Sequence, residues 1–229
     1  MSYGDLLNDQ FNDSQIDPST WLMFAPFSDS SMTESGGNAV FTNRGRLLTI
    51  NSFPTNIDIT GRFEFTGNTH DQFYIVTRTD GTATNPWGGI DNGIGFAFAI
   101  QNDSNNTSNN IGIARMDWPS GGAVLTTGTF SLSLNTFYDF RITDDGTNVA
   151  LYISDLSNPF LTASDSTVFG DKIAMFNREG AGGGSLISAG SVTQLDYVQI
   201  VPEPSSLLLL AATTGVMFVF RRRIKTLIR

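Results

Sequence analysis

Ile94-Gly95-Phe96-Ala97-Phe98-Ala99-Ile100 alternates large apolar residues with small ones. A period of two is the pattern of a β-strand whose two faces meet different surroundings. The glycine and the two alanines on the opposite face indicate either a second surface lying close to the strand or an open concave face. We therefore predict a strand here, with its large side chains in a hydrophobic core.

The alternation recurs along residues 39–200, where helical periodicity is nearly absent. In Ile57–Phe65 the isoleucines and phenylalanines all fall at every second position, on one face of the predicted strand. Tyr138–Ile142 runs into Thr143-Asp144-Asp145-Gly146, a strong turn signal in which we interpret the aspartates as turn residues, and Val149–Ile153 forms the returning strand. Without any βαβ alternation, this pattern predicts an all-β fold, an antiparallel two-sheet sandwich of ten or more strands. Further strands are expected at Arg46–Ile50, Gln72–Thr79, Ile111–Met116, Lys172–Asn177 and Val192–Ile200.

The composition fits an exported domain that is stabilised by packing alone. The chain has 229 residues and no cysteine, so neither a disulfide framework nor a cysteine-ligated metal site is available. Its 18 phenylalanines and 23 glycines are typical of strands joined by many turns. Residues 221–229 hold five of the 13 basic residues and no acid, so the first 220 residues carry 8 basic against 22 acidic residues. So acidic a body argues against nucleic acid as a partner.

The C-terminal residues have the pattern of a membrane address. Val201-Pro202-Glu203-Pro204-Ser205 leads into Leu207–Phe220, which has no charge, and then into the basic stop Arg221, Arg222 and Arg223. As a helix the apolar stretch is about 21 Å long, short of the ~30 Å hydrocarbon core, and the arginines extend it by snorkelling. We expect one C-terminal transmembrane helix rather than a buried core helix, with its basic end in the cytoplasm and the body outside.

This order of motif, helix and basic stop resembles the PEP-CTERM sorting signal of exopolysaccharide-producing Gram-negative bacteria. The resemblance implies an exosortase as partner, a membrane protease that recognises the tail and cleaves near Val201, Pro202, Glu203 and Pro204. It implies an exported protein, first a precursor tethered to the inner membrane and then a component of the cell surface or extracellular matrix. Residues 201–229 are then the sorting signal and residues 1–200 the exported domain.

The beginning of the chain departs from this pattern. Met1–Asp5 has neither the basic region nor the apolar region of a secretory signal peptide, so the signal peptide is missing from this sequence. We expect the true translation start to lie upstream.

Two short segments bracket the strand-rich region. Leu7–Trp21 contains Asp9-Gln10-Phe11-Asn12, followed by Asp17 and Trp21, and Leu195-Asp196-Tyr197-Val198-Gln199-Ile200 closes the region. Both resemble the opening and closing elements of concanavalin A-like lectin and glucanase domains. The resemblance implies a jelly-roll sandwich of two curved sheets over residues 1–200, with Trp21 in its core.

The sequence favours a protein without catalytic activity. The related β-glucanases carry a Glu-x-Asp-x-x-Glu motif on one strand, where a pair of carboxylates cleaves the glycosidic bond. The chain has only Glu34, Glu64, Glu179 and Glu203, and none of them starts that motif. His70 is the only histidine, which excludes a histidine metal cluster. Aspartates from different strands that converge in space leave open a hydrolase or lyase with a non-standard site.

A binding or structural role is the leading hypothesis, with glycans of the matrix as the ligand class. Trp87 and Asp91 lie in one loop rich in turn residues and Trp118 in another, and aromatic rings beside aspartates suit sugar binding. The alternative is that these tryptophans only cover a hydrophobic edge, in a purely structural matrix protein. The resemblance also implies a structural calcium ion at Asp196, against the alternative of a polar residue on an outward face.

Overall fold

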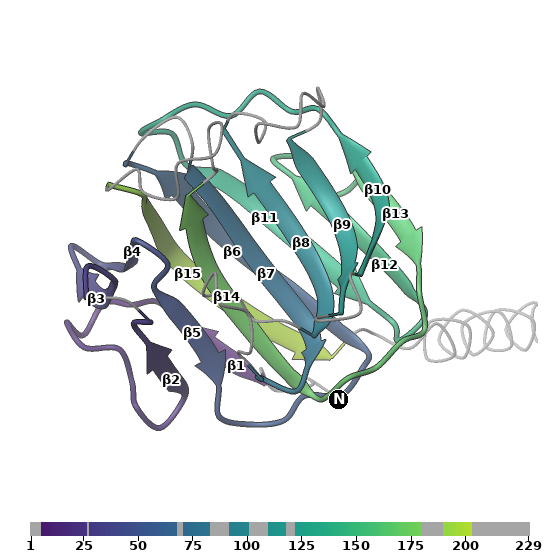
Figure 1. Ribbon diagram of the computed structural model, residues 1–229, viewed down its shortest axis with the longest axis horizontal. Helices are drawn as coiled ribbons and strands as arrows, with labels where there is room; N and C mark the ends of the chain where they lie inside the picture. Colours follow the sequence, from purple (N-terminus) through teal and green to yellow (C-terminus); the bar gives the residue numbers. More distant parts are fainter. Residues whose placement is uncertain are drawn as a thin grey trace, which may run out of the picture.

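A computed structural model describes residues 6–26, 28–67, 71–82, 92–100, 110–117, 122–179 and 190–202. In this part of the chain fifteen β-strands form two antiparallel sheets that lie face to face, and no α-helix is present (Figure 1). The predicted all-β sandwich is therefore confirmed. No helix among these residues is long and apolar enough to cross a membrane, and Leu207–Phe220 lies outside them.

The first sheet has eight strands, with β15 well inside it. Strand β1 (Leu7–Asp9) pairs with β15 beside the main order of the sheet. Across the sheet the order is β13 (Leu161–Ser164), β12 (Asn148–Ile153), β11 (Tyr138–Asp144), β6 (Ile57–Phe65), β15 (Val192–Pro202), β4 (Asn38–Thr42) and β3 (Ser31–Ser35).

The second sheet has seven strands and contains the alternating stretch at Ile94 as β8. Across it the order is β10 (Ala123–Gly128), β9 (Ile111–Met116), β8 (Gly93–Ala99), β7 (Asp71–Thr79), β14 (Lys172–Glu179), β5 (Arg46–Thr49) and β2 (Trp21–Phe24). The alternation predicts nine of the strands, β5 to β9, β11, β12, β14 and β15, all of which are confirmed. It gives no signal for the short strands β1 to β4, β10 and β13.

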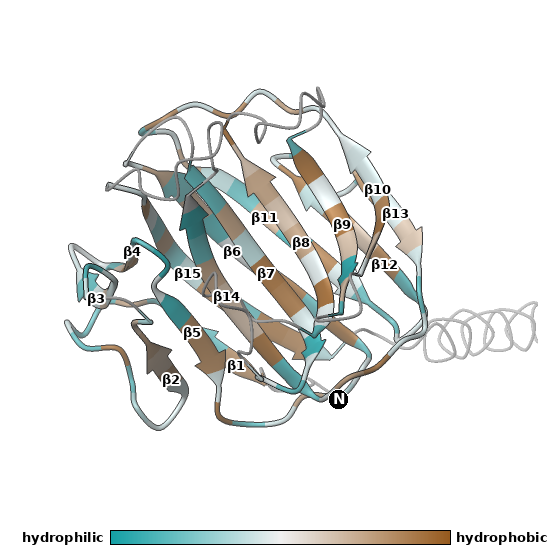
Figure 2. Cartoon of the chain, in the orientation of Figure 1, coloured by the Kyte–Doolittle hydropathy of each residue, from teal (hydrophilic) through white to brown (hydrophobic). Residues whose placement is uncertain are grey.

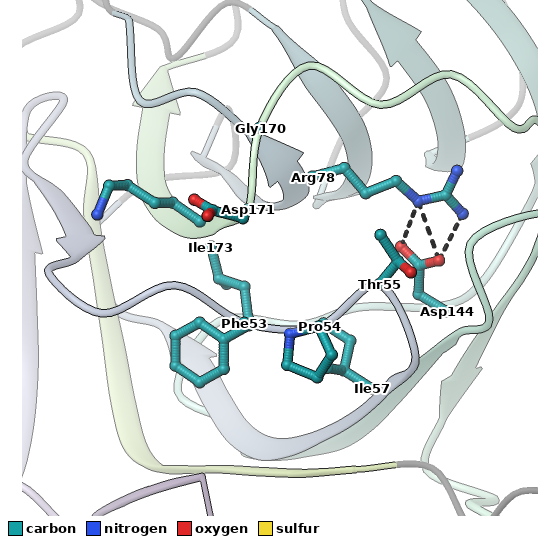
Figure 3. A pocket seen from close by; sticks show the side chains of 10 residues that line it. Phe53, Pro54, Thr55, Ile57, Arg78, Asp144, Gly170, Asp171 and Ile173 are labelled. Atoms are coloured by element: carbon teal, nitrogen blue, oxygen red, sulfur yellow. Dashed lines mark hydrogen bonds and ion pairs between the residues drawn. The ribbon is translucent and has the colours of Figure 1, made fainter.

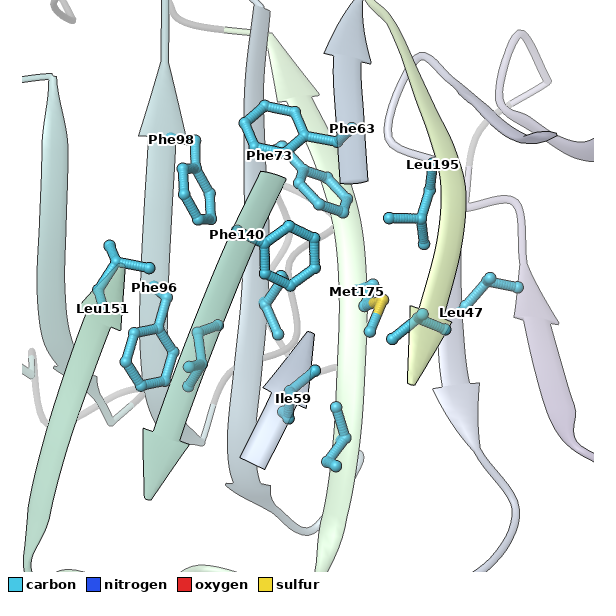
Figure 4. Close-up of a cluster of buried hydrophobic side chains, with 14 of the residues drawn as sticks. Leu47, Ile59, Phe63, Phe73, Phe96, Phe98, Phe140, Leu151, Met175 and Leu195 are labelled. Carbon is cyan, nitrogen blue, oxygen red and sulfur yellow. The ribbon is translucent and has the colours of Figure 1, made fainter. Parts of the chain in front are cut away.

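The core between the sheets is dominated by phenylalanine rings from both layers. The ring centre of Phe63 in β6 lies 4.8 Å from that of Phe98 in β8 and 5.5 Å from that of Phe73 in β7. All three side chains are fully buried, and Figure 4 shows them together with Phe140 of β11. In Figure 2 the strands β8 and β9 show the alternation as brown and paler bands. The burial of each phenylalanine side chain stabilises the fold by roughly 1.5–3 kcal/mol. Packing of this core therefore stabilises a chain that has no cysteine for a disulfide.

The opening and closing motifs lie side by side in the first sheet. Leu7 pairs with Ile200, and β1 thereby lies along the end of β15. Asp9 Oδ1 accepts a hydrogen bond from the Phe11 N–H at 2.9 Å, and Asp9 Oδ2 accepts one from Trp21 Nε1 at 2.8 Å. Phe11 and Trp21 are both buried, which confirms the expected core position of Trp21. Asp9 therefore holds the N-terminal segment in place, because it accepts the hydrogen bond of a buried indole N–H that would otherwise have no partner.

A β-bulge in β7 turns two successive side chains into the space between the sheets. Thr77 and Arg78 lie opposite the single residue Ile173 of β14, and Arg78 has a φ of 54°, in the left-handed region. Thr77 Oγ1 donates to Asp144 Oδ2 at 2.7 Å, and Arg78 Nε lies 2.9 and 3.0 Å from the two oxygens of that carboxylate. Figure 3 shows this ion pair beside a cavity of about 10 Å³, the size of one water.

The ion pair adds a second role to Asp144, which the sequence predicts as a turn residue. Asp144 is the last residue of β11, and the side chains of Arg78 and Asp144 are 1% and 0% exposed. Asp144 Oδ1 also accepts the Gly146 N–H at 2.9 Å, and the turn is completed by Asp145, whose Oδ1 accepts the N–H groups of Thr147 and Asn148 at 2.8 and 2.6 Å. The predicted hairpin is thus confirmed, but its first aspartate links the two sheets. A strand pattern gives no signal for a bulge on a distant strand, so the sequence does not reveal the partner.

We predict that Asp144→Asn destabilises the fold by roughly 3–5 kcal/mol, because it leaves the buried Arg78 without a counter-charge. Urea denaturation followed by tryptophan fluorescence measures the change. Arg62→Ala is the matched control, since Arg62 and its partner Asp139 are 44% and 47% exposed, and it is expected to cost less than about 1 kcal/mol. Equal losses in the two variants would contradict the role of the buried pair.

Candidate functional site

The outward face of the second sheet carries a row of aromatic and basic side chains. The register places Phe24 beside Arg46, Arg46 beside Phe176, and Phe176 beside Tyr74. The rings of Tyr74 and Phe176 are stacked, with centres 4.9 Å apart and planes inclined by 3°. The guanidinium carbon of Arg46 lies 5.9 Å from the centre of the Phe24 ring, within reach of a cation–π contact. This aromatic row spans four neighbouring strands.

A small hydrophobic cluster, which we call the outer cluster, adjoins the row on the face away from the main core. Met116 packs against it, and a Cβ added to Gly95 would lie 2.4 Å from the Met116 sulfur. The small residue in β8 therefore makes room for a side chain of the neighbouring strand. Because this side chain belongs to the same sheet, both expectations for the small residues, a close second surface or an open concave face, stay predictions. The buried members of the outer cluster are Leu48, Val76, Ala174 and Phe176.

The predicted ligand-binding residues Trp87, Asp91 and Trp118 lie outside the described residues. The strands that flank them are described: β8 begins at Gly93, and β9 ends at Met116, which pairs with Gly93. The connection that carries Trp87 and the connection that carries Trp118 are therefore anchored on adjacent strands, at the same end of the second sheet.

The first of these connections begins over the outer cluster. Gly81 follows the end of β7 and has a φ of 77°, which favours glycine. A Cβ added there would lie 2.6 Å from Leu48 Cδ2. The described beginning of this connection thus packs directly on the outward face of the sheet.

Among the side chains that the structure describes, no aspartate or glutamate lies on the outward face of the second sheet; the side chain of Glu179, at the end of β14, is outside them. Asp71 begins β7 but is fully buried, and its Oδ2 accepts the N–H groups of Gly67 at 3.1 Å and Val192 at 3.2 Å. Glu64 lies in β6 of the other sheet, where burial raises its pKa and Arg62 opposes the rise.

Asp196 is the extra residue of a β-bulge in β15, where the register with β6 shifts between Leu195 and Tyr197. Its Oδ2 lies 3.7 Å from Arg62 Nη1, and its side chain is 38% exposed. Asp139 approaches the same guanidinium at 3.9 Å. Burial and the charge of Asp139 raise the pKa of Tyr197. Within the described ranges no group of three or more His, Cys, Asp or Glu could hold a metal ion, and calcium at Asp196 stays a prediction.

If calcium binds at Asp196, millimolar calcium will raise the thermal unfolding temperature of the protein and a chelator will lower it, because an ion that binds only the folded state stabilises it. Asp196→Asn will abolish this difference, whereas Asp139→Asn will retain it. An unfolding temperature that is identical in calcium and chelator would contradict the calcium interpretation and leave Arg62 as the cation beside Asp196. Differential scanning fluorimetry measures both variants.

A polar groove of about 350 Å³ lies where the opening motif folds over the first sheet. Its carboxylates already have protein donors. Asp17 accepts the N–H and the hydroxyl of Ser19, both at 2.8 Å, and the hydroxyl of Thr20 at 2.7 Å, and these bonds lower its pKa. They hold the N-terminal segment in place. The polar residues that line the groove are Asn8, Asp9, Gln10, Asn12, Asp13, Asp17, Thr20 and Asn51.

The predicted sorting motif begins inside the sandwich. Val201 and Pro202 are the last two residues of β15, while Glu203, Pro204, Arg221, Arg222 and Arg223 lie outside the described residues. Residues 201–223 match the family model of the PEP-CTERM protein-sorting motif. The chain carries a PEP-CTERM sorting signal. The resemblance of the tail is thereby confirmed, and the protein is one that is sorted through this signal. No curated protein sequence is similar to this chain.

Solved structures show the same fold as the sandwich. A family 16 glycosyl hydrolase from Mycobacterium smegmatis has a TM-score of 0.59 at 12% identity, over 86% of this chain and 99% of its own. A pseudo beta-1,3-glucanase of Mycobacterium tuberculosis has a TM-score of 0.60 at 14% identity, over 88% and 100%. The carbohydrate-binding module CBM66 from Bacillus subtilis has a TM-score of 0.58 at 11% identity, over 82% and 99%. At such identities the likeness shows the concanavalin A-like fold alone, as the bracketing motifs predict.

The sequence analysis does not single out Tyr74, Arg46 or Phe176, although a signal for them exists. Tyr74 alternates with the buried Phe73 and Phe176 follows the buried Met175, so the period of two already places both on the outward face. The strand order that brings them together is a property of the topology, which the alternation does not specify.

Proposed function

We propose that this protein is a non-catalytic glycan-binding component of the cell surface or its exopolysaccharide matrix. An exosortase-type membrane protease would recognise its tail and remove it after export. The observation that carries the binding role is the outward face of the second sheet, where an aromatic row and the outer cluster lie without any described carboxylate. On this face Phe24 is exposed and Tyr74 is half-buried, and these two rings are available for apolar contact with sugar rings, whereas Arg46 and Phe176 are buried beneath them. Glycoside hydrolysis requires two carboxylates across the scissile bond.

The comparisons support both halves of this proposal. The family model at residues 201–223 supports sorting. Among the structures with the same fold are a module named as carbohydrate-binding and an enzyme relative named as a pseudo-glucanase, so the fold occurs with and without glucanase activity. The connections that carry Trp87, Asp91 and Trp118 are attached at one end of the strands that form this face. This supports the assignment of the three residues as ligand-contacting.

A glycan-processing hydrolase remains the second candidate, because several structures with this fold are named as glycosyl hydrolases. Release of reducing sugar from the host polysaccharide by the purified protein would establish that activity. A protein without glycan binding and without sugar release would be a structural component of the matrix.

We predict that the full-length protein binds polysaccharide from its host in affinity electrophoresis, and that Trp87→Ala or Trp118→Ala weakens binding about tenfold or more, the effect of losing ~1.4 kcal/mol of contact. Tyr152→Ala is the matched control, because Tyr152 lies in β12 of the first sheet, where the Arg141 guanidinium stacks 5.0 Å from its ring centre. Binding that is equally weakened by the control, or absent from the wild-type protein, would contradict the proposed site.

We also predict that the mature protein from its host lacks the C-terminal tail. Mass spectrometry of the exported chain will show a C-terminus in or next to the Pro-Glu-Pro segment, because the tail is recognised there. An exported chain that still ends in Arg229 would contradict processing.

A further inference from the structure

The sorting motif and the sandwich overlap by two residues. The motif begins at Val201, yet β15 continues through Pro202. Val201 pairs with Asp58 and Pro202 with Ile57 at the beginning of β6. The first residues of the recognition signal are therefore part of the folded sheet.

This end of β15 has neighbours on both sides. Beside β6 on one edge, β1 covers the other: Leu7 pairs with Ile200, and the Leu6 N–H donates to the Ile200 carbonyl at 2.9 Å. Figure 1 shows β1 beside the final part of β15. Strand β15 is thus paired on both sides as far as Ile200, while Val201 and Pro202 are held by β6 on one side.

A protease commonly binds its substrate in an extended form, by pairing with the backbone N–H and C=O groups of one strand edge. An interior strand has both edges occupied, so it cannot be bound in this way without first leaving the sheet. Residues up to Ile200 are accordingly withheld from a membrane protease as long as β15 is complete, and Val201 and Pro202 must leave their pairing with β6 before they can be bound.

The distance to the membrane is also short. Only four residues, 203–206, separate Pro202 from Leu207, and five extended steps span at most about 17 Å. The headgroup layer takes up roughly 5–7 Å of that distance. While the tail is in the membrane, the end of the sandwich at Pro202 therefore lies within about 12 Å of the headgroups. Residues 203–206 are too few to hold the whole motif away from the domain.

We propose that the folded end of β15 sets the limit of tail removal: the membrane protease cuts at the Pro202–Glu203 bond or further toward the C-terminus, and β15 slows the cut by holding Val201 and Pro202 in the sheet. This inference rests on the proposed processing of the tail. The cut is the hydrolysis of one peptide bond, which consumes one water and leaves a new carboxylate on the domain and a new amine on the tail.

The test inserts a flexible Gly-Ser spacer of about ten residues between Ile200 and Val201, which keeps the motif intact but takes it out of the sheet. In the producing host, a pulse-chase experiment measures the conversion of precursor to product. We expect the spacer variant to be processed about tenfold faster, the factor that corresponds to ~1.4 kcal/mol for opening the last two pairs of β15. The wild-type product is expected to end at Pro202 or at a later residue by mass spectrometry.

The matched control carries the same spacer between Gly36 and Gly37, in the turn from β3 to β4. A Cβ added to either glycine meets nothing within 4 Å, so the turn has room for the insertion. We expect this variant to be processed at the wild-type rate. A wild-type product that ends at Val201 or earlier would overturn the inference, and so would equal rates for the two spacer variants. A wild-type chain that keeps Arg229 would instead overturn the proposed processing itself.

Discussion

The pairing of β15 with β6 on one side and with β4 and β1 on the other is the constraint on which the rest of the structure depends. It closes the first sheet around a strand from the end of the domain and fixes the N-terminal segment against it. Asp9 can hold the Trp21 indole because β1 is held by this pairing. The same pairing decides where the sandwich ends and the tail begins.

Two polar contacts complement the apolar core by fixing how the two sheets face each other. Hydrophobic packing is non-directional, and many alignments of two phenylalanine-rich faces would bury similar areas. Near one end of β14, the Arg78–Asp144 pair joins the second sheet to β11. Near the other end, Asn177 Nδ2 donates to the Phe41 carbonyl at 3.0 Å and joins β14 to β4. Because a buried polar group without its partner is costly, these contacts favour a single alignment in a chain without disulfides.

The sequence predicts the long strands and the fold class well because their signals are local. In β6, β8 and β11 large apolar residues occupy every second position over most of the strand. The hairpin after β11 also carries residues that are typical of turns. Short strands such as β3, with the sequence Ser-Met-Thr-Glu-Ser, carry no alternation and exist because a neighbouring strand offers an edge. Their formation is a tertiary effect that propensity does not show.

The candidate site could be predicted only in part. The two tryptophan-containing connections are visible in the sequence, but the aromatic row is assembled from four strands that are far apart in the chain. The bulges at Arg78 and Asp196 change which way a side chain points, and a period of two cannot locate such a shift. These are the positions where the sequence did not reveal the second role of Asp144 and where the surroundings of Asp196 were not foreseen.

The interior position of β15 has a mechanical consequence. If the tail is anchored as proposed, drag on the exported domain would be transmitted to the end of β15, and a load along the axis of the strand would act on its pairing with β6 and β1. The hydrogen bonds to β6 and β1 run perpendicular to that axis, so the load is shared by many of them in shear instead of opening them one after another. A tail attached to a hairpin at the edge would open the sheet pair by pair, whereas attachment to β15 would let a tethered domain resist tension.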